Sequence, residues 1–207
     1  MTPDLLTAAL SYLSGSIPFG YLLVLLFRGE DIRRTGSGNI GATNVSRKSP
    51  ALGILTLVLD AMKGFVPVML VVWWAHHHDF VGRTYLLASI AAFFAIVGHI
   101  YPVWLKFHGG KGVATGLGSW IGLAPRGVLV MVVVFILMVA VFRYISLGSI
   151  TAAAIFPVAA RILHDYHDTP PMLWFIAASS FLIITKHHAN IQRLFAGTES
   201  PFRSGRK

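Results

Sequence analysis

Two glycine-rich stretches of this chain combine a flexible backbone with cationic side chains. The first is "TGSGNIGATNVSRK" (35–48), and the second, "KFHGGKGVATG" (106–116), surrounds Lys111 with glycines. Glycines allow successive backbone N–H groups to converge on an anion, and a lysine adds a point charge. The second stretch is not a Walker A loop, which needs Gly-x4-Gly-Lys-Ser/Thr after a strand. Each stretch predicts a phosphate-binding loop, and a plain turn whose cation meets lipid headgroups is the alternative for either one alone.

A third polar stretch, "KHHANIQRLF" (186–195), places a histidine and an asparagine on one face of a helix. His187 and Asn190 are three residues apart, which is the spacing of neighbours on a helix surface. An imidazole with a pKa of ~6.5 is suited to take a proton at neutral pH. The three stretches contain no carboxylate that could orient the histidine as in a catalytic triad. A phosphate oxygen of a substrate, with a second pKa of about 6, is therefore an equal candidate for the base, and His187 would then position the substrate.

Helices that cross a membrane must place these stretches. The 207 residues are 55% hydrophobic and only 12% charged, whereas a soluble domain carries about 25% charged residues. The alternating short segments of a transmembrane β-barrel are absent. The composition predicts one polytopic, all-α integral membrane domain over residues 1–207, whose first apolar segment is retained as a spanning helix. The chain has no cysteine, which excludes disulfides, thiolate metal sites and a thiol acyl intermediate.

Seven apolar segments predict seven transmembrane helices. They are Leu5–Phe27, Ala51–Ala75, Tyr85–Leu105, Val113–Ala124, Gly127–Phe142, Ile145–Ala160 and Met172–Thr185. The first three have the ~20 residues that a helix needs to cross about 30 Å of hydrocarbon, and the last four are shorter. Pro125-Arg126-Gly127 separates the fourth segment from the fifth, because proline and glycine break helices.

The distribution of basic residues predicts the orientation of these spans. With the N-terminus outside, 13 of the 17 Lys and Arg residues lie on one side, and only Arg83, Arg126 and Arg161 lie on the other. Cytoplasmic loops carry such an excess of Lys and Arg. We therefore expect the C-terminus and all three polar stretches on the cytoplasmic side, where the stretches would share one anion site.

Ionisable residues also occur inside the predicted spans. Asp60 and Lys63 are three positions apart in the second span, and charges there usually face the interior of the bundle. We expect a buried ion pair, with a role in closing the phosphate site as the alternative. For His99, in the third span, we expect a hydrogen bond in the core. The consecutive histidines 76–78 predict a solvated loop and no metal site, because neighbouring loop residues rarely converge on one ion.

Three segments closely resemble the signature motifs of a known family. They are "GSGNIGATNV" (36–45), "FHGGKGVATG" (107–116) and the pattern His-x-x-Asn-Ile-x-Arg-Leu (187–194), and with their spacing they cover nearly the whole chain. The family is that of the bacterial acyl-phosphate:glycerol-3-phosphate acyltransferases, the PlsY family. His108 and the pair His188-Ala189 depart from the residues more usual in the family, but they occupy variable positions of the motifs.

The resemblance implies a seven-helix enzyme of the bacterial inner membrane whose active site faces the cytoplasm. It would transfer a fatty acyl group from acyl phosphate to the 1-hydroxyl of glycerol 3-phosphate, giving lysophosphatidic acid and phosphate in phospholipid biosynthesis. The expected partners are acyl phosphate, glycerol 3-phosphate and membrane lipid. We expect no cofactor, no metal and no nucleic acid, and a chain that functions as a monomer.

The matching positions predict the site residues. The catalytic residues would be Ser37, Lys111, His187 and Asn190. The substrate-binding residues would be Gly36, Gly38, Asn39, Gly41, Thr43, Asn44, Arg47, Gly109, Gly110, Gly112 and Arg193. Lys111 and the helix N-terminus behind it would counter the charge on the leaving phosphate. We expect direct acyl transfer, because the donor is already activated and a covalent route needs an oriented base.

Two other functions fit some of these features. A phosphate or phosphate-ester transporter would also use intramembrane charges and anion-binding loops. Its site is expected near the midplane between repeated helices, whereas these polar stretches gather at one surface. A structural protein that binds lipid headgroups does not require three polar motifs at this spacing.

Overall fold

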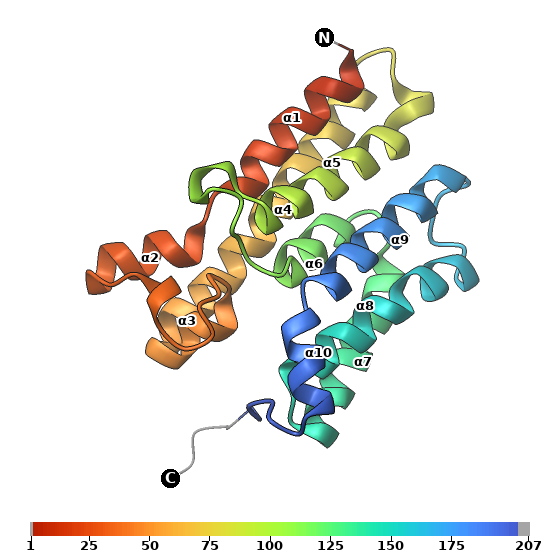
Figure 1. The fold of residues 1–207 in the computed structure, drawn as a ribbon. Helices are drawn as coiled ribbons and strands as arrows, with labels where there is room; N and C mark the ends of the chain where they lie inside the picture. The colour runs from red at the N-terminus through yellow and green to blue at the C-terminus, as the bar shows by residue number, and fades with distance from the viewer. Residues whose placement is uncertain (1, 203–207) are drawn as a thin grey trace. The chain divides into compact units, whose positions relative to one another are not determined.

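The computed structural model describes residues 2–202, and every regular element in that part of the chain is a helix (Figure 1). The α-helices are α1 (Pro3–Ser16), α2 (Phe19–Arg28), α3 (Ala42–Lys48), α4 (Pro50–His76), α5 (Thr84–Ile100), α6 (Val113–Ile121), α7 (Pro125–Phe142), α8 (Ile145–Ile162), α9 (Pro170–Thr185) and α10 (His188–Phe195). Three 3-10 turns are η1 (Ile32–Arg34), η2 (Val81–Arg83) and η3 (Val103–Leu105).

The predicted all-α membrane fold is confirmed. Within the described residues, five helical segments are long and apolar enough to cross a membrane. They are Pro3–Arg28, Pro50–His76, Val81–Leu105, Pro125–Phe142 and Ile145–Ile162. α6 has nine residues and α9 has 16, fewer than the ~20 of a perpendicular span. The count of seven spans and their orientation stay predictions.

Two prolines mark the breaks between helices. The predicted break at Pro125 is confirmed, because α6 ends at Ile121 and α7 begins at Pro125, where a proline loses no helical hydrogen bond. The first predicted span, by contrast, is interrupted, since α1 ends at Ser16 and α2 begins at Phe19. Pro18 disfavours a helical conformation of the residue before it, and Ile17 is extended (φ −61°, ψ 116°).

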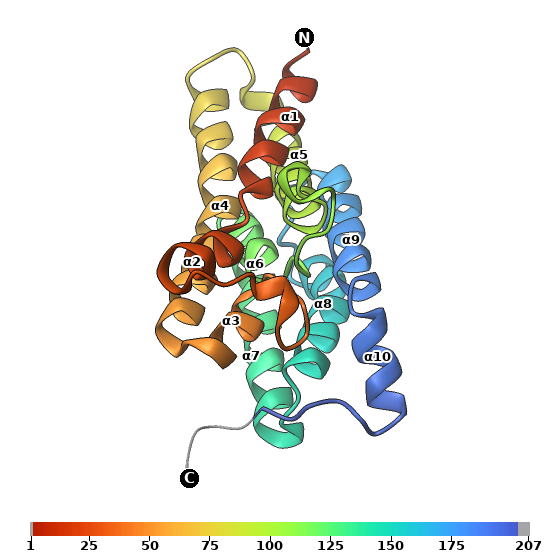
Figure 2. The same cartoon turned by 60° about the vertical axis from the view of Figure 1, so that its left-hand side comes forward.

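The described residues pack as two compact units, with the boundary between Leu123 and Ala124. In the first unit, α1, α4 and α5 run side by side, and α6 packs against α4 and α5 (Figures 1 and 2). α2 and α3 pack against α4 and against each other. A Cβ atom on Gly15 would lie 2.0 Å from the Ala95 carbonyl oxygen, and one on Gly98 would lie 2.2 Å from that of Tyr12. Glycine at these positions lets α1 and α5 approach closely, as small residues do in membrane bundles.

In the second unit, α8 packs against α7 and α9, and α10 contacts α8 (Figure 1). The carboxylate of Asp165, which follows α8, accepts a hydrogen bond from the Gly127 N–H at the start of α7 (2.9 Å). This bond satisfies one of the N–H groups that a helix start leaves open. The bond ties the loop after α8 to the start of α7. The third polar stretch begins at the end of α9 in the same unit. That the chain forms a single membrane domain stays a prediction.

Candidate active site

The first glycine-rich stretch forms a tight turn between η1 and α3, with Ser37 exposed at its tip. Gly36 and Gly38 have positive φ values of 58° and 69°, a conformation that favours glycine. The Gly38 N–H donates to the Thr35 carbonyl (3.0 Å) and closes the turn. Gly36 and Gly38 therefore give the turn a defined backbone conformation, in which Ser37 between them is exposed.

The Asn44 side chain organises this turn from within. Its Oδ1 accepts a hydrogen bond from the Ser37 N–H (3.0 Å). Its Nδ2 lies within hydrogen-bond distance of three carbonyl oxygens, those of Ile32 (3.3 Å), Thr35 (3.0 Å) and Asn39 (2.9 Å). The residue is almost completely buried. Its predicted role as a substrate ligand is untested, and these contacts favour a role in positioning Ser37.

Two exposed polar side chains of α3 flank the turn. Arg47 lies beside Gly36, since one of its terminal guanidinium nitrogens would be 3.7 Å from a Cβ atom there. Thr43 is exposed at the start of the helix. Gly41 precedes α3, and its N–H donates to the Asn39 side-chain oxygen (2.8 Å). Arg47 thus lies beside the glycine that directly precedes the exposed Ser37. A guanidinium group and a hydroxyl are suitable ligands for a phosphate or a carbonyl oxygen.

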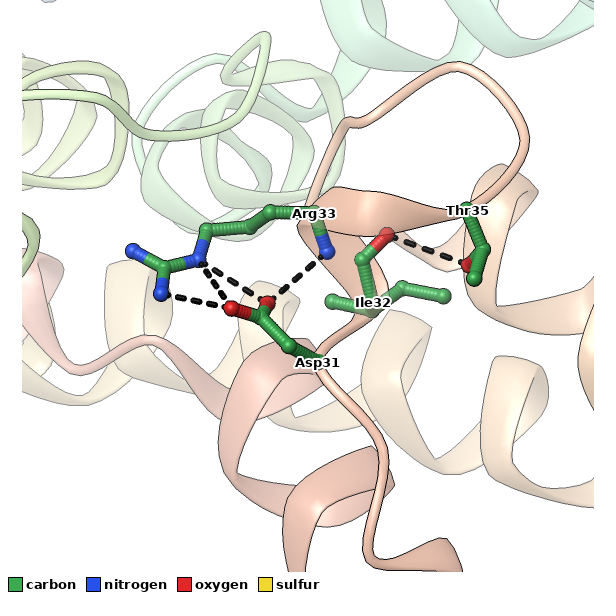
Figure 3. A network of polar contacts seen from close by, with 4 residues as sticks. All are labelled: Asp31, Ile32, Arg33 and Thr35. Atoms are coloured by element: carbon green, nitrogen blue, oxygen red, sulfur yellow. Dashed lines mark hydrogen bonds and ion pairs between the residues drawn. The ribbon is translucent and has the colours of Figure 1, made fainter.

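An ion pair stabilises the segment that precedes the turn (Figure 3). Arg33 donates to both carboxylate oxygens of Asp31, with a shortest distance of 2.7 Å. The hydrogen bonds from the Arg33 side chain lower the pKa of Asp31 to about 2. The guanidinium also stacks over the Tyr21 ring at 4.7 Å. Arg33 is therefore occupied in fixing η1 to α2.

The second glycine-rich stretch folds back onto the end of α5. The N–H groups of Gly109 and Gly110 donate to the carbonyls of Ile100 and His99, both at 3.1 Å. A Cβ atom on Gly110 would lie 2.0 Å from His99 Nε2, so only glycine fits there. Gly112 has a φ of 81° and directly precedes α6. Lys111 therefore lies between a fixed glycine doublet and the N-terminus of a helix, whose first N–H groups favour anions.

One hydrophobic cluster joins the segments that carry these two loops. It contains Val24, Ile32, Ile40, Val45 and Leu105, all almost fully buried. Ile40 and Val45 belong to the first loop and to α3, and Leu105 ends η3 just before the second loop. The structure thus brings together the supports of two predicted motifs that are about 70 residues apart in the sequence.

The third motif lies in the second unit, at the junction of α9 and α10. His187 is buried, and its Nδ1 lies 2.7 Å from the Ile183 carbonyl oxygen. A neutral ring that donates from Nδ1 has its lone pair on Nε2, the tautomer that suits a general base. Asn190 is also buried, one turn further along. That this motif shares one site with the first two stays a prediction.

Sequence reasoning missed a carboxylate beside the third motif. Glu199 accepts hydrogen bonds from Asn190 Nδ2 (2.6 Å) and Ser146 Oγ (2.6 Å), and forms an ion pair with Arg193 (2.7 Å). It lies nine residues after Asn190, beyond the end of α10. Helical spacing could not reveal this contact, because a turn after Phe195 brings the glutamate back. Burial raises the pKa of Glu199, but the three partners outweigh it and hold the pKa below 4.5.

We expect the Glu199 contacts to make the stability of the second unit depend on pH. A carboxyl group whose pKa is lowered by folding adds stability above its unfolded pKa, and this stability is lost as the pH falls through the folded value. The thermal midpoint of the wild type should therefore exceed that of Glu199→Gln at pH 7, and the difference should shrink as the pH falls below 4.5.

Glu30→Gln is the control, because Glu30 forms an exposed ion pair with Lys48 (2.8 Å), and such pairs contribute little to stability. It should follow the wild-type profile in the same detergent. A difference between wild type and Glu199→Gln that stays constant as the pH is lowered from 5 to 2 would contradict this account.

The predicted site residues divide between the two units. The first unit contains Gly36, Ser37, Gly38, Asn39, Gly41, Thr43, Asn44, Arg47, Gly109, Gly110, Lys111 and Gly112, and the second contains His187, Asn190 and Arg193. Arg193, a predicted substrate ligand, is paired with Glu199. The histidines of the loop after α4 behave as expected for a solvated segment, since His77 and His78 are exposed and bond to carbonyls of their own helix.

Comparisons with known proteins agree on one family. A family model described as glycerol-3-phosphate acyltransferase matches residues 5–197. The glycerol-3-phosphate acyltransferase of Trichlorobacter lovleyi is 48% identical over 205 residues, covering 99% of this chain and 100% of the relative. The protein of the same name from Syntrophotalea carbinolica is 44% identical, with the same coverage of both chains.

Solved structures show the same similarity. The crystal structure of PlsY, an integral membrane glycerol 3-phosphate acyltransferase, in its glycerol 3-phosphate form is 36% identical. It matches with a TM-score of 0.87 over 97% of this chain and 96% of that one. The lysophosphatidic acid form is 34% identical and matches with a TM-score of 0.83 over the same shares of the two chains.

Proposed function

Since the chain belongs to the glycerol-3-phosphate acyltransferase family, and so is a membrane acyltransferase of phospholipid synthesis that acylates glycerol 3-phosphate, we propose that its donor is acyl phosphate. We further propose that the acceptor is the 1-hydroxyl, so that lysophosphatidic acid and phosphate are released. The observation that carries this proposal is the pair of glycine-rich loops, each with a cation, whose supports pack in one hydrophobic cluster. Two such loops suit a reaction in which both substrates carry a phosphate. No relative favours the transporter alternative.

The reaction follows from this arrangement. The glycerol hydroxyl oxygen attacks the acyl carbonyl carbon and forms the ester bond, while the bond between that carbon and the phosphate oxygen breaks. The phosphate leaves with the electron pair. Lys111 and the start of α6 would hold the leaving phosphate, with Gly109 and Gly110 fixing the loop against α5. Ser37 and Arg47 would hold glycerol 3-phosphate or the carbonyl oxygen. Asn44 would keep Ser37 in place.

The third motif would act on the same substrates. His187 or a phosphate oxygen of a substrate takes the hydroxyl proton. Asn190 would hydrogen-bond to a substrate, and Arg193 would bind phosphate when it is not fully engaged by Glu199. The acyl group passes directly from donor to acceptor, because the donor has a good leaving group and a covalent intermediate would lower no evident barrier.

The proposal extends to the setting of the enzyme. We place it in the bacterial inner membrane with seven spans, its N-terminus outside and its active site facing the cytoplasm, because 13 of the 17 Lys and Arg residues would then lie inside. It would function as a monomer, since every proposed residue comes from one chain. The specific activity should then be unchanged on dilution.

Sealed membrane vesicles test donor and orientation together. Inside-out vesicles that contain the enzyme should release phosphate and form lysophosphatidic acid when acyl phosphate and glycerol 3-phosphate are both added. Neither coenzyme A nor a metal should be required. Right-side-out vesicles should respond only after permeabilisation, because glycerol 3-phosphate is charged and stays outside. Activity with acyl-CoA but not with acyl phosphate would refute the donor, and equal activity of both sealed preparations would refute the orientation.

A further inference from the structure

A buried charged cluster lies in the first unit, outside the two loops. Asp60 and Lys63 on α4 and His99 on α5 are exposed by only 2%, 5% and 3%. Lys63 Nζ lies 2.8 Å from Asp60 Oδ1, which confirms the predicted ion pair, and His99 Nδ1 lies 3.7 Å from the same oxygen. These three residues are called the Asp60 cluster below.

Helix packing alone does not account for this cluster. Removing charges from water is costly, and apolar residues of similar volume would hold two helices at least as well. Asp60 and Lys63 also stand on the same helix, so their ion pair by itself joins no two elements. The contacts that the cluster makes elsewhere are therefore the more informative feature.

His99 extends from the cluster to the second loop. Its backbone carbonyl accepts the hydrogen bond from the Gly110 N–H (3.1 Å). Its ring lies directly against Gly110, since a Cβ atom on that glycine would be 2.0 Å from Nε2. The ring therefore lies between the Asp60 carboxylate, on its Nδ1 side, and the residue that precedes Lys111, on its Nε2 side.

Lys63 extends from the cluster toward the first loop. Its Nζ donates to the Ile17 carbonyl (2.7 Å), at the break between α1 and α2. α2 in turn supports the first loop. Gly20 is in close contact with the Ile40 carbonyl, and Val24 belongs to the hydrophobic cluster that also contains Ile40 and Val45. The same charged group thus contacts the supports of both phosphate loops.

We propose that Asp60, Lys63 and His99 are positioning residues that hold the two loops, and Lys111 above all, in the geometry for phosphate binding. This inference rests on the proposed function of those loops. Asp60 fixes the His99 ring through Nδ1, the ring fixes Gly110, and Lys63 fixes the break that directs α2 beneath the first loop.

Two substitutions of His99 test the contacts of its two ring nitrogens separately. The amide of His99→Asn would stand where Nδ1 stands, toward Asp60, and would leave the side toward Gly110 empty. The amide of His99→Gln would reach the position of Nε2 and keep the contact with the loop. We expect kcat/KM for glycerol 3-phosphate to fall at least about tenfold in His99→Asn and to stay within about threefold of the wild type in His99→Gln.

The thermal midpoint distinguishes positioning from mere stability. Both variants should melt within a few degrees of each other, while their activities differ. Equal kcat/KM values, or activities that simply follow the two midpoints, would overturn the proposal. Asp4→Asn, which breaks the exposed ion pair with Arg83 (2.9 Å), should leave activity unchanged.

A neutral pair of substitutions keeps the proposal testable if neither His99 variant folds. Asp60→Leu with Lys63→Met removes both charges together, and such replacements are often neutral or stabilising. The double variant should melt at or above the wild-type midpoint and still lose at least about tenfold in kcat/KM. Wild-type activity would overturn the positioning role.

Failure of this inference differs from failure of the proposed site. If Lys111→Ala is inactive while folded His99→Asn has wild-type kinetics, only the positioning role is refuted. If Lys111→Ala has wild-type kinetics, the phosphate role of the second loop is refuted, whatever the His99 variants do.

Discussion

Replacing Lys111 with alanine is expected to lower kcat/KM for acyl phosphate by about 10²–10³-fold, the effect of removing one donor that stabilises charge in a transition state. Lys111 follows a glycine doublet whose N–H groups are already bonded to α5, so the chain enters α6 at a defined position. Charge develops on the phosphate oxygen as the bond to the acyl carbon breaks. A cation held beside a helix N-terminus stabilises that charge more than it stabilises the bound donor.

Lys106 provides the matched control for this experiment. It stands in the same stretch, is exposed and directly follows η3, with a positive φ of 51°. Lys106→Ala should change kcat/KM by less than about threefold, because an exposed charge is screened by salt. Phosphate release and lysophosphatidic acid would both be followed, with the thermal midpoint measured for each variant. Equal, modest losses in the two variants would remove the argument for a specific phosphate site.

The features that sequence reasoning predicted correctly are local ones. The all-helical membrane fold was evident because lipid-facing helices must be apolar, and Pro125 marked a helix start because proline suits the first turn. The glycines of the two loops were interpreted as positions where the backbone binds phosphate, and that role stays a prediction. The structure shows that protein side chains pack against two of them, Asn44 at Gly36 and the His99 ring at Gly110. The ion pair of Asp60 and Lys63 followed from their spacing.

The features that it missed depend on contacts between distant residues. Pro18 looked like part of one span, because hydropathy continues through it while the hydrogen bonds do not. Glu199 lies beyond the last helix, and only the turn after α10 brings it to Asn190 and Arg193. The burial of the Asn44 amide inside its own loop also depends on tertiary folding and was not predicted. Its role as a substrate ligand stays a prediction.

Because the Asn44 amide is buried, we expect the small substitution Asn44→Asp to lower kcat/KM severely. Asn44→Asp alters one NH₂ group to an oxygen and keeps the acceptor that holds the Ser37 N–H. The substitution also replaces the Nδ2 group, which donates to the carbonyl oxygens of Ile32, Thr35 and Asn39, with a negatively charged oxygen that faces those three oxygens. A buried acceptor that loses its donor costs about 1–3 kcal/mol, and an unpaired buried charge costs more. The loop should therefore open, and kcat/KM should fall at least about 10²-fold.

Asn39→Asp is the matched control for Asn44→Asp, because it adds the same negative charge to the same loop. The Asn39 side chain contributes its oxygen to the Gly41 N–H (2.8 Å), and an aspartate makes that bond equally well. If repulsion of the substrate phosphate were the cause of inactivity, the two variants would lose activity alike. If the loop geometry is the cause, Asn39→Asp should retain activity within about fivefold, while Asn44→Asp does not.

Raising the glycerol 3-phosphate concentration should restore the activity of a variant that suffers only from charge repulsion, since that defect raises KM and leaves kcat unchanged. If the activity of Asn44→Asp recovers fully at high glycerol 3-phosphate concentration, the Asn44 amide serves substrate binding alone. The hydrogen bonds inside the loop would then not be required to hold Ser37 in place for the reaction.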